Sequence, residues 1–143
     1  MLRDKAGQTI VEAVVVIGVV VLLVTGLVAG TTASLRSAAS GRSKAQAVKY
    51  AQEAMEDMRA LRDQRWSTFQ AHNGYYCYGS DKSLIPASLG SCTVNVKTSQ
   101  GTFIRSVTFL WDGQKMKIDV SVLFDESGTR QNVTLTTYLT QWK

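Results

Sequence analysis

The stretch AGQTIVEAVVVIGVVVLLVTGLVAG, residues 6–30, decides the fold. It contains one charged residue, Glu12, and the next charged side chain after it is Arg36. As a helix, the uncharged residues 13–35 would be about 35 Å long, against a bilayer hydrocarbon thickness of about 30 Å. Length and composition therefore predict a membrane-spanning helix, with its most apolar part at residues 13–29.

A cleaved secretory signal peptide is the alternative interpretation of this segment. It has a short basic start, an apolar middle and small residues near positions 28–30, which are features of such peptides. However, its apolar part is longer than the usual length of about 7–15 residues, and a helical pattern continues beyond it. We therefore expect the segment to stay in the mature protein.

The residues before the apolar run carry a more specific pattern. A polar leader with Arg3 and Lys5 ends in Gly7, and QTIVE follows directly. This order resembles the start of type IV pilins and their pseudopilin relatives, in which a leader ending in glycine precedes a T-[IVL]-[IVL]-E-like run. The resemblance implies that a prepilin peptidase cleaves between Gly7 and Gln8. Gln8 would then be the new N-terminus and the candidate site of N-methylation, although the family more often has Phe or Met there.

The resemblance also assigns Glu12 a role in assembly, because it matches the family glutamate, fifth in the mature chain. Helices of this family leave the membrane and bundle in a filament core. An α-amine at Gln8 and a carboxylate at Glu12 are each costly in an apolar core and less costly when neighbouring subunits pair them. The implied partners are other pilin subunits, the prepilin peptidase, an inner-membrane assembly platform and, before assembly, membrane lipid. The implied location is a single pass in the cytoplasmic membrane and then a cell-surface filament.

Three glycines interrupt the apolar run. Gly18, Gly26 and Gly30 each cost up to about 1 kcal/mol relative to alanine in a helix. Gly26 and Gly30 form a GxxxG pair, which allows another helix to approach closely. Glycine is also common in membrane helices in general, so helix close packing is a hypothesis for these three positions. The family often has a proline in this half of the helix, whereas the only proline here is Pro86.

The helical pattern continues from Arg36 to about Gln70. Apolar residues recur there every three or four positions and predict one buried stripe: Val48, Ala51, Met55, Met58 and Leu61. The charged residues lie mostly off this stripe and predict a solvated face. A continuous helix from Gln8 to near Trp66 would be roughly 88 Å long. The segments YAQEAMEDMRALRDQRW, residues 50–66, and VTLTTYLTQW, residues 133–142, also resemble modification-type minor pilins.

Residues 71–92 are rich in Gly, Ser, Asn and Tyr and predict an irregular connection. Cys77 and Cys92 bracket 14 residues of this connection, and an exported domain favours a disulfide between them over two free thiols. In the chain-entropy model a loop of this size contributes about 3 kcal/mol. For the neighbouring tyrosines at positions 75, 76 and 78 we favour packing under the loop over an adhesive patch.

The C-terminal part predicts four antiparallel strands with period-two alternation. The first contains Val94 and Val96, and the others have apolar residues of one parity: Phe103, Val107, Phe109 and Trp111; Met116, Ile118, Val120, Val122 and Phe124; Val133, Leu135 and Leu139. Asp112-Gly113 predicts a hairpin turn. The expected fold is α+β and pilin-like: a long N-terminal helix, hydrophobic then amphipathic, packed on a four-stranded antiparallel sheet. The expected divisions are a leader at 1–7, a transmembrane or filament-core helix at 8–35 and an exported head at 36–143.

The sequence favours a structural subunit over an enzyme. It has one histidine, and it lacks a Gly-x-Ser-x-Gly element, a P-loop and a usual zinc-ligand set, so we expect no catalytic residue, no metal and no cofactor. The first alternative is a tip-located minor pilin that binds DNA or a surface through four basic residues: Lys97, Arg105, Lys115 and Lys117. The second is an exported domain anchored by a single membrane span. The mild net charge of +5 does not by itself indicate a nucleic-acid surface.

Overall fold

The computed structural model describes residues 5–93, 95–98, 101–126 and 128–141. The chain divides into two compact units, Met1–Ala39 and Ser40–Lys143. The boundary lies a few residues after position 36, where the sequence places the start of the head. Val94, assigned to the first predicted strand, lies outside the described residues.

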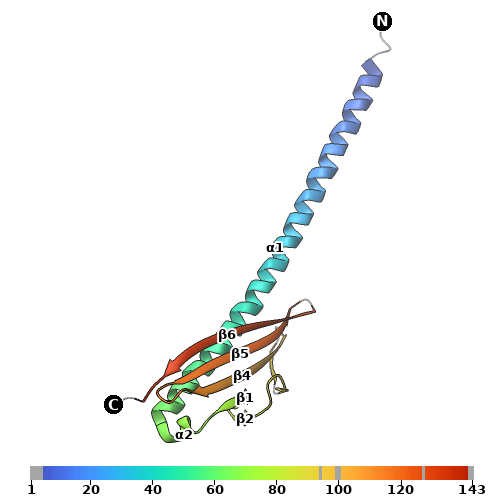
Figure 1. The fold of residues 1–143 in the computed structure, drawn as a ribbon. Coiled ribbons are helices and arrows are strands. Elements are labelled where there is room, and N and C mark those ends of the chain that lie inside the picture. The colour runs from blue at the N-terminus through green and yellow to red at the C-terminus, as the bar shows by residue number, and fades with distance from the viewer. Residues whose placement is uncertain (1–4, 94, 99–100, 127, 142–143) are drawn as a thin grey trace. The chain divides into compact units, whose positions relative to one another are not determined.

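The main helix, α1, extends over Lys5–Gln64 (Figure 1). The expected long N-terminal helix is therefore present, and neither Gly41 nor the three glycines of the apolar run interrupts it. The predicted continuation to Gln70 is wrong. Arg65 is extended (φ −153°, ψ 98°), and a separate five-residue helix, α2, follows at Trp66–Gln70.

No proline or glycine lies near Arg65 to end the helix there. Aromatic packing explains the break instead. The turn brings Phe69 fully into the core, where its ring lies 5.9 Å from that of Phe109 in an edge-to-face arrangement. Trp66 makes a similar contact with Trp111 at 5.9 Å. Edge-to-face pairs of this kind contribute about 0.5–1.5 kcal/mol beyond their buried area, which favours a change of direction at the single non-helical residue, Arg65.

The part of the chain that the structure describes forms a sheet of six strands, so the prediction of four is wrong. The strands are β1 (Gly74–Tyr78), β2 (Leu84–Pro86), β3 (Asn95–Thr98), β4 (Gly101–Trp111), β5 (Met116–Glu126) and β6 (Thr129–Leu139). All pairings are antiparallel, in the order β2-β1-β4-β5-β6, and β3 also pairs with β4. Figure 1 shows β4, β5 and β6 side by side.

The two unpredicted strands, β1 and β2, lie within the segment expected to be an irregular connection. Their residues GYYCY and LIP do not alternate between apolar and polar side chains. Strand pairing forms them instead. In β1, Gly74 lies opposite Phe109 and Cys77 lies opposite Ser106 on β4, so these contacts join residues about 30 positions apart. β2 pairs with the outer edge of β1 across a short connection, with Pro86 opposite Tyr76. Local alternation predicts neither pairing.

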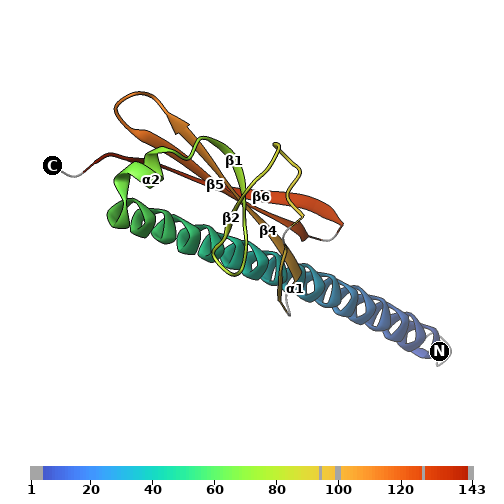
Figure 2. The ribbon, with the colours of Figure 1, turned by 90° about the horizontal axis from the view of Figure 1, so that it is seen from below.

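The core lies between the C-terminal part of α1 and one face of the sheet (Figure 2). The predicted alternation is confirmed in β5, where every second side chain from Met116 to Phe124 is buried. The helix stripe is shifted from the prediction. Ala47 and Ala54 are fully buried and Val48 is not, while Ala51, Met55 and Met58 are buried as expected. The small alanine side chains allow α1 to pack closely against the sheet, so they occupy buried positions in place of the larger Val48.

The predicted turn after β4 forms between Asp112 and Lys115. A carboxylate oxygen of Asp112 accepts hydrogen bonds from the backbone N–H groups of Gln114 at 3.0 Å and Lys115 at 2.8 Å. These bonds lower the pKa of Asp112 below its ordinary value. Gly113 has a φ of +94°, a conformation that L side chains rarely adopt. The Asp-Gly pair thus fixes the hairpin that aligns β4 with β5.

Candidate functional site: the apolar helix segment and the head cluster

The apolar segment of α1 is exposed on every side. All large hydrophobic side chains from Ile10 to Leu35 retain between 50% and 74% of their surface. The most apolar stretch of 18 residues in this helix has a mean hydropathy of 2.8, and the helix is one candidate membrane span among the described residues. A helix that is hydrophobic all round needs an apolar environment, either lipid or other helices. The described part of the chain supplies no such cover.

Glu12 lies near the start of this segment and is exposed. Within the described residues its carboxylate has no ion pair, and the next acidic residue along the chain is Glu53. Gly7 and Gln8 both belong to α1, whereas the side chain of Gln8 lies outside the described part. The predicted cleavage, methylation and pairing at Gln8 stay predictions.

The three glycines of the apolar segment have open space around them. A Cβ atom built on Gly18, Gly26 or Gly30 would meet nothing within 4 Å. No contact within the described residues therefore requires glycine at these positions. The space is compatible with the close approach of another helix, as the sequence suggests.

The head contains a cluster of charged and aromatic side chains around Arg105. This side chain of β4 is 2% exposed, and its Nη2 donates a hydrogen bond of 2.6 Å to the backbone oxygen of Gly79. The guanidinium carbon lies 4.6 Å from the ring centroid of Tyr78 and 5.7 Å from that of Tyr50. Glu53 on α1 lies 3.8 Å away. The cluster thus joins α1, β1 and β4.

Asp57 is the second centre of this cluster. It accepts hydrogen bonds from the Tyr78 hydroxyl at 2.6 Å and from Nζ of Lys82 at 2.8 Å. Burial raises the pKa of Asp57, but these two bonds and the nearby positive charges outweigh it, so the pKa lies below its ordinary value of 3.8. Burial and the bond to Asp57 raise the pKa of Tyr78 well above its ordinary value of 10.0. Asp57 therefore carries a charge and Tyr78 a proton at neutral pH.

The sequence pattern did not predict this cluster, although the position of Arg105 in its strand indicates that the residue is buried. Arg105 has the same parity as Phe103, Val107 and Phe109, so the alternation of β4 points it into the core. A cation at an inward position implies a buried partner set. Its partners on β1 and α1 lie 26 or more residues away in sequence and follow only from the pairing of β1 with β4.

The four residues predicted to contact a polyanion do not form one surface. Arg105 is buried, donates a hydrogen bond to Gly79 and packs against the rings of Tyr50 and Tyr78. Lys117 pairs with Asp119 at 2.9 Å, and this hydrogen bond raises its pKa. Lys115 lies 4.8 Å from the ring centroid of Tyr138.

The fourth residue, Lys97, lies far from the other lysines along the sheet. Lys97 is opposite Thr102 on β4, whereas Lys117 is opposite Leu110. Eight residues of strand separate these two positions, which is about 26 Å. The four residues therefore do not form one continuous basic patch on the head.

The predicted disulfide between Cys77 and Cys92 is present, with Cα atoms 5.4 Å apart. It ties β1 to the segment that follows β2. Of the nearby tyrosines, Tyr78 is fully buried and Tyr76 packs against the core, with its ring 5.4 Å from Phe109. Tyr75 is half-buried. Packing rather than an adhesive patch therefore accounts for the two inward tyrosines.

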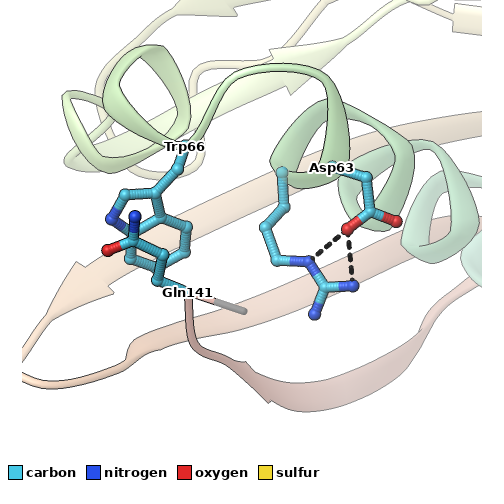
Figure 3. Close-up of a pocket in the computed structure, with 4 residues that line it drawn as sticks. Asp63, Trp66 and Gln141 are labelled. Atoms are coloured by element: carbon cyan, nitrogen blue, oxygen red, sulfur yellow. Dashed lines mark hydrogen bonds and ion pairs between the residues drawn. The ribbon is translucent and has the colours of Figure 1, made fainter. Parts of the chain in front are cut away.

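The head also has several open hollows. One of about 410 Å³ is lined by Arg62, Asp63, Trp66 and Gln141, and Figure 3 shows the ion pair that Arg62 forms with Asp63 at its side. A second, of about 530 Å³, lies beside Asp57, His72 and Lys82. Among the described residues no three His, Cys, Asp or Glu side chains are grouped closely enough to hold a metal ion.

Comparison of the chain with protein-family models, with curated proteins and with solved structures gave no match in any of the three. The family assignment stays a prediction from the residues quoted above.

Proposed function

We propose that this chain is a structural subunit, of the minor-pilin kind, of a type IV pilus or related pseudopilus. A prepilin peptidase would cleave it between Gly7 and Gln8, and α1 would hold it in the membrane until assembly. The single observation that carries the proposal is the apolar segment from Ile10 to Leu35, exposed on all sides, with Glu12 at its start. Such a surface needs a lipid or multi-helix environment.

Glu12 supplies the specific element of the proposal. In a bundle of these helices, its carboxylate would pair with the α-amine of Gln8 on a neighbouring subunit. At about 4 Å and an effective dielectric constant near 20, the attraction is about 4 kcal/mol before desolvation is subtracted. The pairing would fix the axial register between subunits. A pair within one chain would contribute nothing to assembly.

The second half of α1 supports the same proposal. Residues of α1 beyond Ser40 pack against the antiparallel sheet and form a compact head with its own core. A disulfide ties β1 to the segment after β2 within this head. A disulfide persists in an oxidising compartment, which favours export of the head. The sequence and fold together are those expected of a subunit that presents a head outside the membrane and buries its apolar helix elsewhere.

The experiment compares Glu12→Gln with Glu56→Gln in the producing cell. Glu12→Gln keeps the shape of the side chain and removes the charge, so we expect a normal level in the membrane and at least about a tenfold loss from the sheared filament fraction. Glu56→Gln removes one exposed charge from the head, where the carboxylate pairs with Arg59 on the surface of α1, and should assemble normally. Equal incorporation of the two variants would contradict the proposed role of Glu12.

The alternative of an exported domain anchored by a single span shares the helix and the head. It differs in the fate of the N-terminus, because it needs neither cleavage after Gly7 nor extraction from the membrane. Glu12→Gln would then leave the distribution of the chain between membrane and medium unchanged. The polyanion-binding alternative receives no support from the positions of its four residues.

A further inference from the structure

The positive charge of the chain is concentrated on one part of α1, directly after the apolar segment. Residues 36–49 hold four basic residues and no acidic one, whereas residues 50–143 hold ten basic and nine acidic residues. We call residues 36–49 the basic segment; its cations are Arg36, Arg42, Lys44 and Lys49. Most of the net charge of +5 therefore lies in about a tenth of the chain.

The cations of the basic segment have no acidic partners among the residues that the structure describes. All four are exposed, and within the described residues none of them forms an ion pair. Several other cations of the head are paired with acidic residues. Lys82 pairs with Asp57 at 2.8 Å and Lys117 with Asp119 at 2.9 Å. A concentration of unpaired like charges repels itself unless anions lie nearby.

The position along α1 indicates what those anions are. Arg36 directly follows Leu35, the last large apolar residue of the exposed segment, and Arg42 and Lys44 follow within three helical turns. The headgroup layer adds roughly 5–8 Å to each side of the hydrocarbon core. Electrostatic attraction extends about 8 Å further at physiological ionic strength. Lys49 lies about 21 Å beyond Leu35 and is the least favourably placed of the four.

We propose that the basic segment binds the anionic headgroups of membrane phospholipids while α1 spans the bilayer. Each Lys or Arg next to a membrane span increases the affinity for such a surface roughly fivefold. Lysine and arginine side chains are also long enough to bend towards the phosphate layer. The inference rests on the membrane-spanning part of the proposed function and is independent of filament assembly.

Export of the head increases the need for anionic lipid beside the basic segment. Positive residues beside a span are usually kept on the cytoplasmic side, and the proposed topology places the basic segment on the other side. A headgroup layer that neutralises Arg36, Arg42 and Lys44 gives these residues a favourable environment there. Extraction of α1 from the bilayer would then also require release of these lipids.

The test uses the purified full chain in phosphatidylcholine vesicles that contain trace amounts of spin-labelled lipid. Electron paramagnetic resonance measures how strongly spin-labelled phosphatidylglycerol associates with the chain relative to spin-labelled phosphatidylcholine. We expect a preference for the anionic lipid of at least about threefold at low salt. Raising the salt to 1 M, where the screening length is about 3 Å, should bring the ratio close to one.

A triple variant, Arg36→Gln with Arg42→Gln and Lys44→Gln, should lose the preference at low salt. The matched control removes three exposed cations from the head instead: Arg65→Gln with Lys97→Gln and Arg130→Gln. It loses the same net charge and should keep the preference. Circular dichroism checks that both variants retain the helix.

Three results would overturn the proposal. The wild-type chain could show equal association of the two lipids, the triple variant could keep the preference, or the head control could lose it as well. Displacement of the anionic lipid by stoichiometric double-stranded DNA would instead assign the basic segment to nucleic acid. A failed Glu12→Gln experiment affects filament assembly alone and leaves this ratio unchanged, so the two proposals fail separately.

Discussion

Tyr78→Phe tests whether the hydrogen bond to Asp57 holds β1 against α1. The substitution removes one hydroxyl and keeps the ring that fills the core and stacks on Arg105. The lost bond is 2.6 Å long and has a charged acceptor. Hydrogen bonds to charged groups contribute about 1.5–3 kcal/mol. Since the Asp57 side chain is 23% exposed, we expect a loss in the free energy of unfolding near the lower limit, about 1.5 kcal/mol.

The assay is denaturant unfolding of the full chain in detergent, followed by the fluorescence of Trp66 and Trp111, which both lie against the core. Tyr138→Phe is the matched control, because Tyr138 is 55% exposed on β6, and its effect should stay within about 0.5 kcal/mol. In a double-mutant cycle with Asp57→Asn, the two substitutions should couple by about 1 kcal/mol. Equal midpoints for Tyr78→Phe and Tyr138→Phe would refute the reasoning.

The pH dependence of this effect has a definite sign. The pKa of Asp57 in the folded head lies below its ordinary value of 3.8. A carboxyl group whose pKa is lowered on folding stabilises the fold above its unfolded pKa, and this contribution is lost as pH falls through the folded pKa. The difference between wild type and Tyr78→Phe should therefore be full at neutral pH and shrink below about pH 4.

Two further perturbations test the core and the loop of the head. Replacing Cys77 and Cys92 together by serine should lower the free energy of unfolding by about 3 kcal/mol, because the loop is no longer closed in the unfolded chain. A thermal melt should show a decrease of roughly 10–20 °C, and reduction of the wild-type protein should reproduce it; an unchanged melting temperature would contradict the assigned role of the disulfide. Met58→Ala should cost about 2–5 kcal/mol because Met58 is 2% exposed in the core, whereas Val48→Ala should cost less than about 1 kcal/mol. Chemical denaturation distinguishes the two, and a larger effect at Val48 would restore the stripe that the sequence predicts.

The elements that could be predicted from the sequence are those with strong local periodicity. Long apolar and amphipathic stretches predicted α1, and alternation predicted β4, β5 and β6, because these patterns record burial residue by residue. The Asp112-Gly113 turn was likewise encoded locally. Spacing and an exported head predicted the disulfide between Cys77 and Cys92.

The remaining features depend on contacts between distant parts of the chain. β1 forms because it pairs with an edge of β4, and β2 forms because it pairs with β1. The break at Arg65 allows Phe69 to pack against Phe109. The burial of Arg105 was readable from its parity, but its partners were not. In the apolar segment, the role proposed for Glu12 depends on a partner outside this chain. The fold of a single chain does not show that partner, so the proposal for Glu12 comes from the sequence motif.

The mass of the mature N-terminus tests the central claim most directly. The chain is isolated from the membranes of the producing cell, digested, and its N-terminal peptide identified by tandem mass spectrometry. The account predicts a chain that begins at Gln8, with or without a methyl group, and a Gly7→Ala variant that keeps its leader. A native chain that retains Met1, or one that begins near residue 31, would contradict it.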